Sequence, residues 1–265
     1  MTDKNEVNII KARSFDGGII QIECHNCVTS TAKLAKQYAN SGYPDRYMIF
    51  SSTQTESDAF GERLSEGQVS NGMFLSCIFR PSMFPSQAGL LRAMASVAMI
   101  TALEEHTTKK LGIGWVSDIF CEGKKIGGVT LEGKLDNFTS YEYIIITFRM
   151  KLDKSIFPPR LVDMVKSVFE NESASKELII AKSILSKFFP LYFNLKNHAK
   201  FMDVYKSKFA MKGQRAKYII DSKKVTCKIA GIDSATGSLT VELKGGKPCS
   251  VSTPTQVILP KRVKF

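Results

Sequence analysis

Residues 111–133 constrain the fold of this chain more than any other segment. They read LGIGWVSDIFCEGKKIGGVTLEG, which is typical of a strand, a short polar turn centred on Gly123, and a second strand. Trp115 and the neighbouring isoleucines supply side chains that favour strands, and Gly127-Gly128 lets another group approach the backbone closely. Because Lys125 enters the second strand beside these glycines, the segment favours a site for an anionic or carbonyl-bearing ligand.

The rest of the first 208 residues indicates an α+β fold, with a mixed sheet flanked by helices. Residues 51–72 are polar and poor in apolar anchors, so we expect a long mobile loop over a pocket. Strands are expected at residues 19–22, 47–50, 73–79 and 141–150, and helices at residues 32–38, 89–106, 160–170 and 174–188.

After about Phe209 the pattern changes to short strands separated by turns. Strands are expected at residues 216–220, 224–229, 238–243, 248–252 and 256–259, which predicts a small all-β, SH3-like barrel. We therefore divide the chain into a flexible lead-in (1–18), an α/β domain (19–208) and a C-terminal β domain (209–265).

The net charge of +12 is concentrated in the last quarter of the chain. From Lys196 onward there are 15 Lys and Arg residues against 4 Asp and Glu, a balance of +11, whereas residues 1–195 hold 22 against 21. Such a surface suits an acidic protein domain or nucleic acid, and it is equally consistent with solvated lysines. Since no RNA- or DNA-binding signature accompanies the charge, nucleic acid is the less favoured partner.

The cysteines and the hydropathy pattern favour a reducing, cytoplasmic location with no membrane partner. No apolar run reaches the roughly 20 residues needed to cross a bilayer, and the first residues lack the apolar segment of a signal peptide. The spacing of Cys24 and Cys27 suits the start of a zinc site or a redox pair. No second C-x-x-C or H-x-x-H follows at zinc spacing, so ordinary thiols near a strand end are favoured and no metal ligands are assigned.

Two motifs in residues 111–133 resemble the biotin–protein ligase (holocarboxylase synthetase) family. Gly114-Trp115-Val116-Ser117-Asp118-Ile119 is similar to the family pattern K-W-P-N-D-[IL], and Lys125-Ile126-Gly127-Gly128-Val129 is similar to K-[ILM]-[AG]-G-[IV]. The resemblance runs from about Ile20 to Arg262 at low identity, with its parts in the family order. It implies the biotin/lipoate ligase fold followed by a small C-terminal domain.

The resemblance also implies roles for individual residues. Biotin would be bound by Ser30, Thr31, Gln54, Lys125, Gly127 and Gly128. ATP would be bound by Trp115, Ser117 and Asp118, with Mg²⁺ as a cofactor. Lys125 and Arg63 would act in catalysis by balancing negative charge on the carboxylate and phosphate. Taken without the family, Ser30-Thr31 is equally a plain helix N-cap, Asp118 a turn residue and Lys125 a solvated lysine.

Several family positions are changed in this chain. The glycine- and arginine-rich loop of the family corresponds to residues 54–63, where Asp58 and Phe60 replace two arginines. Gly114 replaces the lysine before the tryptophan. The later G-x-N strand corresponds to Thr147-Phe148-Arg149-Met150, and we expect the bulk of Phe148 to narrow or reshape the pocket.

The resemblance implies a biotin–protein ligase that forms biotinyl-5′-adenylate and transfers biotin to a lysine in the acceptor domain of a carboxylase. The changed positions keep two alternatives open: a non-catalytic pseudoenzyme that retains the ligase fold for binding or assembly, and a lipoate-type ligase. Neither the oligomeric state nor the acceptor follows from the sequence.

Overall fold

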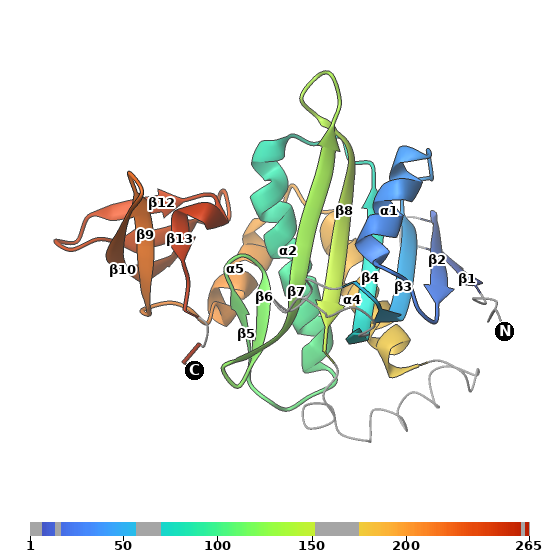
Figure 1. Ribbon diagram of the computed structural model, residues 1–265, viewed down its shortest axis with the longest axis horizontal. Helices are drawn as coiled ribbons and strands as arrows, with labels where there is room; N and C mark the ends of the chain where they lie inside the picture. Colours follow the sequence, from blue (N-terminus) through green and yellow to red (C-terminus); the bar gives the residue numbers. More distant parts are fainter. Residues whose placement is uncertain (1–6, 14–16, 57–69, 152–174, 261–262, 265) are drawn as a thin grey trace.

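The computed structural model describes residues 7–13, 17–56, 70–151, 175–260 and 263–264. Within these residues it contains an eight-stranded sheet with the order β1-β2-β3-β4-β8-β7-β6-β5 (Figure 1). β2 and β3 pair in parallel, and the other neighbours are antiparallel. The strands are β1 (Asn8–Arg13), β2 (Ile19–His25), β3 (Tyr47–Gln54), β4 (Ser70–Phe79), β5 (Leu111–Gly114), β6 (Asp118–Cys121), β7 (Lys124–Leu135) and β8 (Tyr141–Met150).

Helices cover the two faces of this sheet unequally. α1 packs on one face against β3, β4 and β8, in a small cluster that includes Ile49 and Ile145. α2, α4 and α5 lie on the opposite face, where the main core gathers (Figure 1). No described helix packs over β6 and β7 on the α1 face, so a ligand can approach the sheet there. The helices are α1 (Thr31–Asn40), η1 (Pro85–Gln87), α2 (Ala88–Glu104), α4 (Lys176–Tyr192) and α5 (Ala199–Lys208).

α2 is the central helix of the core because it is apolar on most of its faces. It packs between the sheet and the helices α4 and α5. The segment Pro85–Glu104 is long and apolar enough to cross a membrane by length and composition alone, but 61% of its apolar window is buried inside the protein, as is usual for a core helix.

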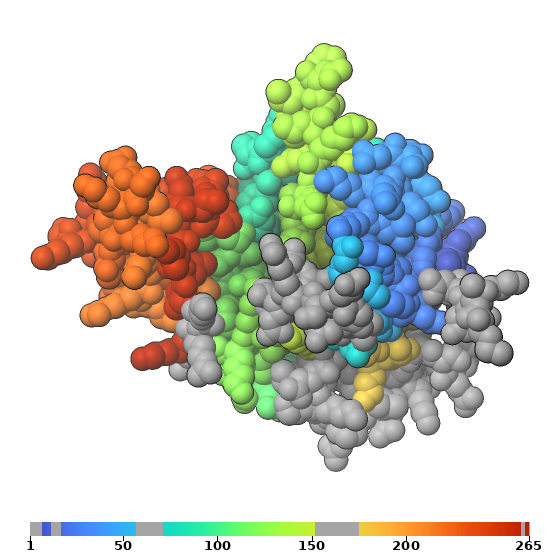
Figure 2. Space-filling model, in the orientation of Figure 1, coloured from blue at the N-terminus to red at the C-terminus, as the bar shows by residue number. Residues whose placement is uncertain are grey.

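A second sheet follows α5 and forms a separate lobe beside the first (Figure 2). It has five strands in the order β12-β11-β10-β9-β13, and neighbouring strands are antiparallel. The two edge strands do not pair, so the sheet is open and the expected closed barrel is not present in the described residues. Its strands are β9 (Arg215–Ile220), β10 (Lys223–Ile232), β11 (Leu239–Glu242), β12 (Pro248–Val251) and β13 (Val257–Ile258), with the short helix η2 (Pro254–Gln256) before β13.

The two lobes meet where backbone approaches backbone. A Cβ atom added to Gly89 in the first turn of α2 would overlap the Thr236 carbonyl oxygen, and one added to Gly237 would lie 2.9 Å from the Gly89 oxygen. Trp115 adds a hydrogen bond across the same junction, from Nε1 to the Gly237 oxygen at 3.1 Å. Glycine at both positions therefore permits the C-terminal sheet to pack directly on α2.

The structure corrects three expectations drawn from the sequence. The lead-in contains a strand, β1, which pairs with β2 and extends the sheet. The expected loop 51–72 is shorter, because β3 runs to Gln54 and β4 begins at Ser70; residues 57–69 lie outside the described residues. α5 was not expected, and the helix expected near 160–170 lies outside the described residues.

Candidate functional site

The N-terminus of α1 is joined to three strands by a chain of buried polar groups. Ser30 caps the helix, since its side chain accepts a hydrogen bond from the Lys33 amide at 3.4 Å. Thr31 donates its backbone N–H to Gln54 Oε1 at 2.6 Å, and its hydroxyl lies 3.3 Å from the same oxygen. Ser76 Oγ lies 2.9 Å from Thr31 Oγ1 and 2.8 Å from Thr147 Oγ1.

These contacts give the chain a direction. When Thr31 donates to Gln54, Ser76 donates to Thr31 and Thr147 donates to Ser76, every hydroxyl proton has an acceptor. Gln54 Nε2 has no hydrogen-bond partner among the described residues and is left as a donor at the sheet face. Sequence reasoning singled out Thr31 and Gln54 but missed Ser76 and Thr147, which the strand pattern alone does not mark as polar partners.

Glu23 holds α1 on the sheet from its other end. The Glu23 carboxylate is buried, and it accepts hydrogen bonds from the hydroxyls of Tyr38 at 3.0 Å and of Tyr47 at 2.5 Å. Burial, followed by the Glu23 hydrogen bond, raises the pKa of Tyr38 to about 12. His25 Nε2 lies 2.6 Å from the same carboxylate. This cluster fixes the helix whose first turn carries Ser30 and Thr31.

Lys125 and Asp118 form an ion pair at the adjoining ends of β6 and β7. Lys125 Nζ lies 2.7 Å from Asp118 Oδ1, and both side chains are about one third exposed. Asp118 is opposite Gly128 in the sheet, and the pairing of β6 with β7 shifts register between Ile119 and Phe120. The pair therefore stands at the open part of the α1 face, as the sequence suggested for a cationic ligand-binding residue.

Gly127 and Gly128 are required by the sheet itself. A Cβ atom on Gly127 would overlap the Arg149 carbonyl oxygen, and one on Gly128 would lie 2.7 Å from the Ser117 oxygen. Gly114 is equally confined, because a Cβ atom there would lie 2.6 Å from Phe120 Cε2 and 2.8 Å from Met211 Cε. The family lysine at this position does not fit the packing of this chain.

The structure corrects the expectation for β8. Phe148 points into the main core and contacts the Phe188 ring edge-on, with 5.7 Å between centroids, so its bulk does not reach the α1 face. By strand alternation, Thr147 and Arg149 lie on the α1 face instead. Arg149 pairs with Phe74 on one side and with Gly128 on the other. A half-buried arginine thus stands on the sheet face between the polar chain and the Lys125–Asp118 pair.

Trp115 and Ser117 are placed at the junction of the lobes. Both are buried, with 4% and 2% of their surface exposed, and Ser117 has a φ of 72°. The backbone of Ser117 accepts a hydrogen bond from the Val129 amide at 3.0 Å. Asp118 directly follows this turn, so the junction and the ion pair are connected through three consecutive residues.

Two assignments have no place in this geometry. Arg63 lies outside the described residues. Cys24 and Cys27 are unpaired thiols, and the described residues contain no group of three His, Cys, Asp or Glu side chains placed to hold a metal ion. The structure thus brings Thr31, Gln54, Lys125, Asp118 and Gly128 to one sheet face.

Comparisons with known proteins were made by sequence and by structure. No family model matches the chain. It is 28% identical over 145 residues to the bifunctional ligase/repressor BirA of Bacillus subtilis; the match covers 54% of this chain and 45% of that protein, so the chain spans about half the length of the curated relatives it matches.

Solved structures agree with the sequence match. The fold is similar to that of the Aquifex aeolicus biotin protein ligase in complex with biotin and ATP, with a TM-score of 0.63, 17% identity, and coverage of 90% of this chain and 98% of that chain. A biotin protein ligase-like protein of unknown function from Silicibacter sp. TM1040 has a TM-score of 0.61 at 11% identity, with coverage of 88% and 94%. By sequence relationship and by fold, this chain belongs with the biotin protein ligases.

Proposed function

We propose that this chain is an ATP-dependent biotin–protein ligase. In the first step a biotin carboxylate oxygen attacks the α-phosphorus of ATP, which forms biotinyl-5′-adenylate and releases pyrophosphate. In the second step a lysine amine of an acceptor domain attacks the acyl carbon, which forms an amide and releases AMP. Neither step needs a protein nucleophile, so the work of the site is positioning and charge stabilisation.

The observation that carries this proposal is the set of groups on the α1 face. Gln54 offers a donor, held by Thr31, for a neutral polar group such as the biotin ureido ring. Lys125 offers a cation for the carboxylate and the phosphate, and Gly128 leaves the sheet low between them. Apolar floor is supplied by Phe74, which pairs with Arg149 across the same face.

Mg²⁺ fits the donor set through Asp118. This ion is usually held by one or two carboxylates together with substrate phosphates, and Asp118 is the carboxylate at the open end of the site. When bound, Mg²⁺ would neutralise phosphate charge. Lys125 would then exchange its contact with Asp118 for one with the substrate, and Ser30 would keep the first turn of α1 in place.

Biotin-dependent exchange of labelled pyrophosphate into ATP tests this function directly. Exchange with biotin, and none with lipoate or octanoate, is expected. Exchange with lipoate or octanoate alone would instead support the lipoate-type ligase. No exchange with any of these acids, together with no heat of biotin binding, would contradict ligase activity.

The second candidate is a non-catalytic protein with the ligase fold. It is favoured by Arg149 and Thr147 on the α1 face of β8 and by the absence of room for a side chain at Gly114. The same exchange assay separates the two candidates, because a binding protein would take up biotin or an adenylate without exchanging pyrophosphate.

The partner and location follow from the same proposal. We propose that the acceptor is a biotin-carrying domain of a carboxylase, that the reaction takes place in the cytoplasm, and that the C-terminal sheet acts as an SH3-like module of the enzyme. Residues 19–208 and 209–265 would then be its catalytic and accessory domains.

A further inference from the structure

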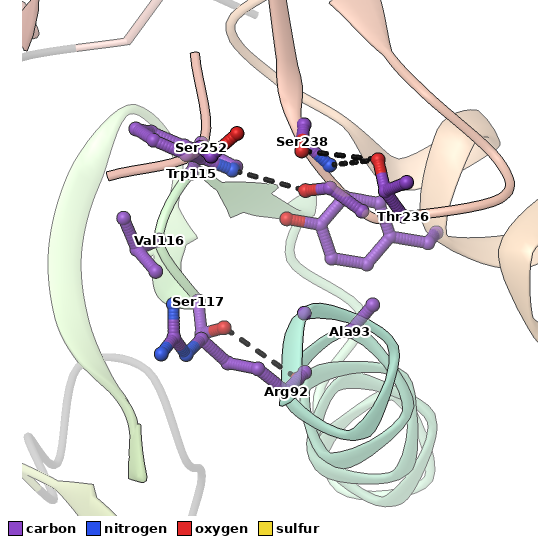
Figure 3. Close-up of a pocket in the computed structure, with 11 residues that line it drawn as sticks. Arg92, Ala93, Trp115, Val116, Ser117, Thr236, Ser238 and Ser252 are labelled. Carbon is purple, nitrogen blue, oxygen red and sulfur yellow. Dashed lines mark hydrogen bonds between the residues drawn. The ribbon is translucent and has the colours of Figure 1, made fainter. Parts of the chain in front are cut away.

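A small cavity lies at the junction of the two lobes, outside the group of residues on the α1 face. Its volume is about 30 Å³, enough for about two water molecules or the oxygens of one small anion. Its walls come from the first turns of α2, the turn after β5, α5 and the loops of the C-terminal sheet (Figure 3). The polar side chains that line it are Arg92, Ser117, Tyr205, Thr236, Ser238 and Ser252.

Arg92 supplies the charge of this cavity. Its guanidinium group is half-buried, and no hydrogen bond or ion pair of this group occurs among the described residues. Only its backbone oxygen is used, by Ser96 Oγ at 2.9 Å and by Ser117 Oγ at 3.5 Å (Figure 3). Burial lowers the pKa of Arg92, and the groups that act against this are the hydroxyls of Tyr205 and Tyr141.

A second group points to the same kind of ligand. Tyr205 is 2% exposed and lines the cavity, yet its hydroxyl has no hydrogen-bond partner among the described residues. The carboxylate that acts on this hydroxyl is Asp118, and Asp118 is already paired with Lys125 at 2.7 Å. A cation and a nearly buried hydroxyl donor are thus both left without an acceptor, which costs free energy unless a ligand supplies one.

Hydroxyl donors complete the ring on the side of the C-terminal sheet. Thr236 Oγ1 lies 2.8 Å from Asp233 Oδ1 and 3.0 Å from Ser238 Oγ, so the loop that carries these hydroxyls is held in place. Ser252 is exposed at the edge of the cavity and its hydroxyl has no partner in the described part of the chain. Arginine with several hydroxyls is a donor set suited to tetrahedral oxyanions.

We propose that the junction cavity is an oxyanion site that takes one phosphoryl group. Because Arg92 belongs to α2 and Ser238 and Ser252 belong to the C-terminal lobe, the bound anion joins the two lobes. The cavity holds no more than one such group, so a polyphosphate would place its terminal phosphate here and leave the rest outside. The site is independent of biotin and does not require the ligase reaction.

Titration calorimetry of the full chain at constant ionic strength tests the site, with inorganic phosphate, pyrophosphate and ATP as separate ligands. Arg92→Gln should weaken phosphate binding by about tenfold or more, on the scale of hydrogen bonds to charged groups. Ser252→Asp should have a similar effect, because it places a negative charge at the edge of the cavity without disturbing a buried side chain. Arg215→Gln is the matched control, since it removes the same charge from an exposed strand position.

Each outcome decides the question. Binding of phosphate that Arg92→Gln and Ser252→Asp abolish and Arg215→Gln retains supports the site, and stronger binding of ATP than of phosphate identifies the nucleotide as the source. No binding by the wild type, or equal effects of Arg92→Gln and Arg215→Gln, overturns it. If Arg92→Gln fails to fold, Ser252→Asp gives the decision. Loss of pyrophosphate exchange leaves this site standing, whereas intact exchange without phosphate binding rejects this site alone.

Discussion

Lys125 carries the positive charge that the proposed reaction needs, and its contacts show that folding does not depend on it. Its pair with Asp118 is about one third exposed, so water screens the interaction and its contribution to stability is small. We expect Lys125→Ala to weaken the binding of biotinyl-adenylate by about 1.5–3 kcal/mol, because a charge-assisted contact to the phosphate is lost. Calorimetry of the wild type and the variant measures this difference.

Lys124→Ala is the control for this change. It removes the same charge one residue earlier, and strand alternation directs the Lys124 side chain to the opposite face. Its effect on binding should be negligible, and both variants should melt within about 1–2 °C of the wild type, as is usual for surface substitutions. Equal losses of binding at the two positions would contradict the assignment of Lys125.

Arg149 is the residue that separates a modified ligase from a protein that has lost the site. It lies in the row of the sheet that contains Gly128 and Asp118, two strands from the Lys125 pair. With strands about 4.8 Å apart, its long side chain can meet a ligand held by Lys125. We expect Arg149→Met to weaken biotinyl-adenylate by roughly 1.5–3 kcal/mol and biotin alone by less, because the adenylate adds a phosphate charge.

A competition assay with both ligands measures this difference at Arg149. A variant that binds biotin more tightly than the wild type would show that Arg149 obstructs the site, and the non-catalytic candidate would then be preferred. Thr147→Val tests the neighbouring polar chain in the same assay, since it removes the hydroxyl that lies 2.8 Å from Ser76 while keeping the volume.

At the scale of elements, the turn between β10 and β11 determines how the C-terminal sheet meets α2. The Asp233 carboxylate accepts hydrogen bonds from Ala235 and Thr236, and the Thr236 hydroxyl and amide hold the pKa of this carboxyl below its ordinary value of 3.8. The next residue, Gly237, accepts the Trp115 indole N–H. The turn is thus positioned by one ionised side chain.

We expect Asp233→Ala to loosen this turn and to shift the fluorescence of Trp115, the only tryptophan, to longer wavelength as its indole meets water. A carboxyl with a lowered pKa stabilises the fold above its ordinary pKa, and this contribution is lost as the pH falls through the lower folded value. The wild type should therefore show the same shift on acidification below about pH 4. Asp233→Asn, which keeps an acceptor, should restore the emission at neutral pH but not its acid dependence.

Most elements of the large sheet could be predicted from the sequence, and the exceptions have physical reasons. The strand pair around Gly123 and the helix α2 follow from alternation and from a long apolar run. β1 is polar at its ends and forms because β2 offers an edge. α5 has few apolar residues and is stabilised by burying Phe201, Met202 and Tyr205 against α2, a tertiary contact that no local pattern contains.

The candidate site was predictable only in part, for similar reasons. Lys125, Gly128, Thr31 and Gln54 were found through a family pattern. Arg149 was assigned to the wrong side of its strand through its neighbour Phe148, because the direction of a side chain in a strand is decided by which face the long-range core occupies. The junction cavity joins Arg92 to residues more than a hundred positions later, which sequence spacing does not reveal.

At the scale of the whole molecule, the basic charge of the last quarter becomes an ordered surface. The exposed side chains of β9 and β10 alternate with the buried residues Ala216, Cys227 and Ile229. Since Arg215 is opposite Lys228 and Lys217 is opposite Thr226, one outer face of the sheet carries four cations. This basic strand face consists of Arg215, Lys217, Lys224 and Lys228.

The basic strand face makes a prediction about the transfer step, which depends on the proposed ligase activity. An acidic acceptor domain would be steered by it, and electrostatic steering raises association rates by about tenfold or more at low salt. We expect Lys217→Glu with Lys224→Glu to lower kcat/KM for the acceptor by roughly tenfold at low ionic strength and to leave biotin-dependent pyrophosphate exchange unchanged, because the α1 face is untouched. Added salt should reduce the wild-type rate towards that of the variant. Lys11→Glu with Lys36→Glu, which makes the same change in net charge on the α/β lobe, is the control. Equal losses in the two double variants would show that net charge alone matters, and a loss of pyrophosphate exchange in the first would show that the C-terminal sheet acts on the chemistry instead of on docking.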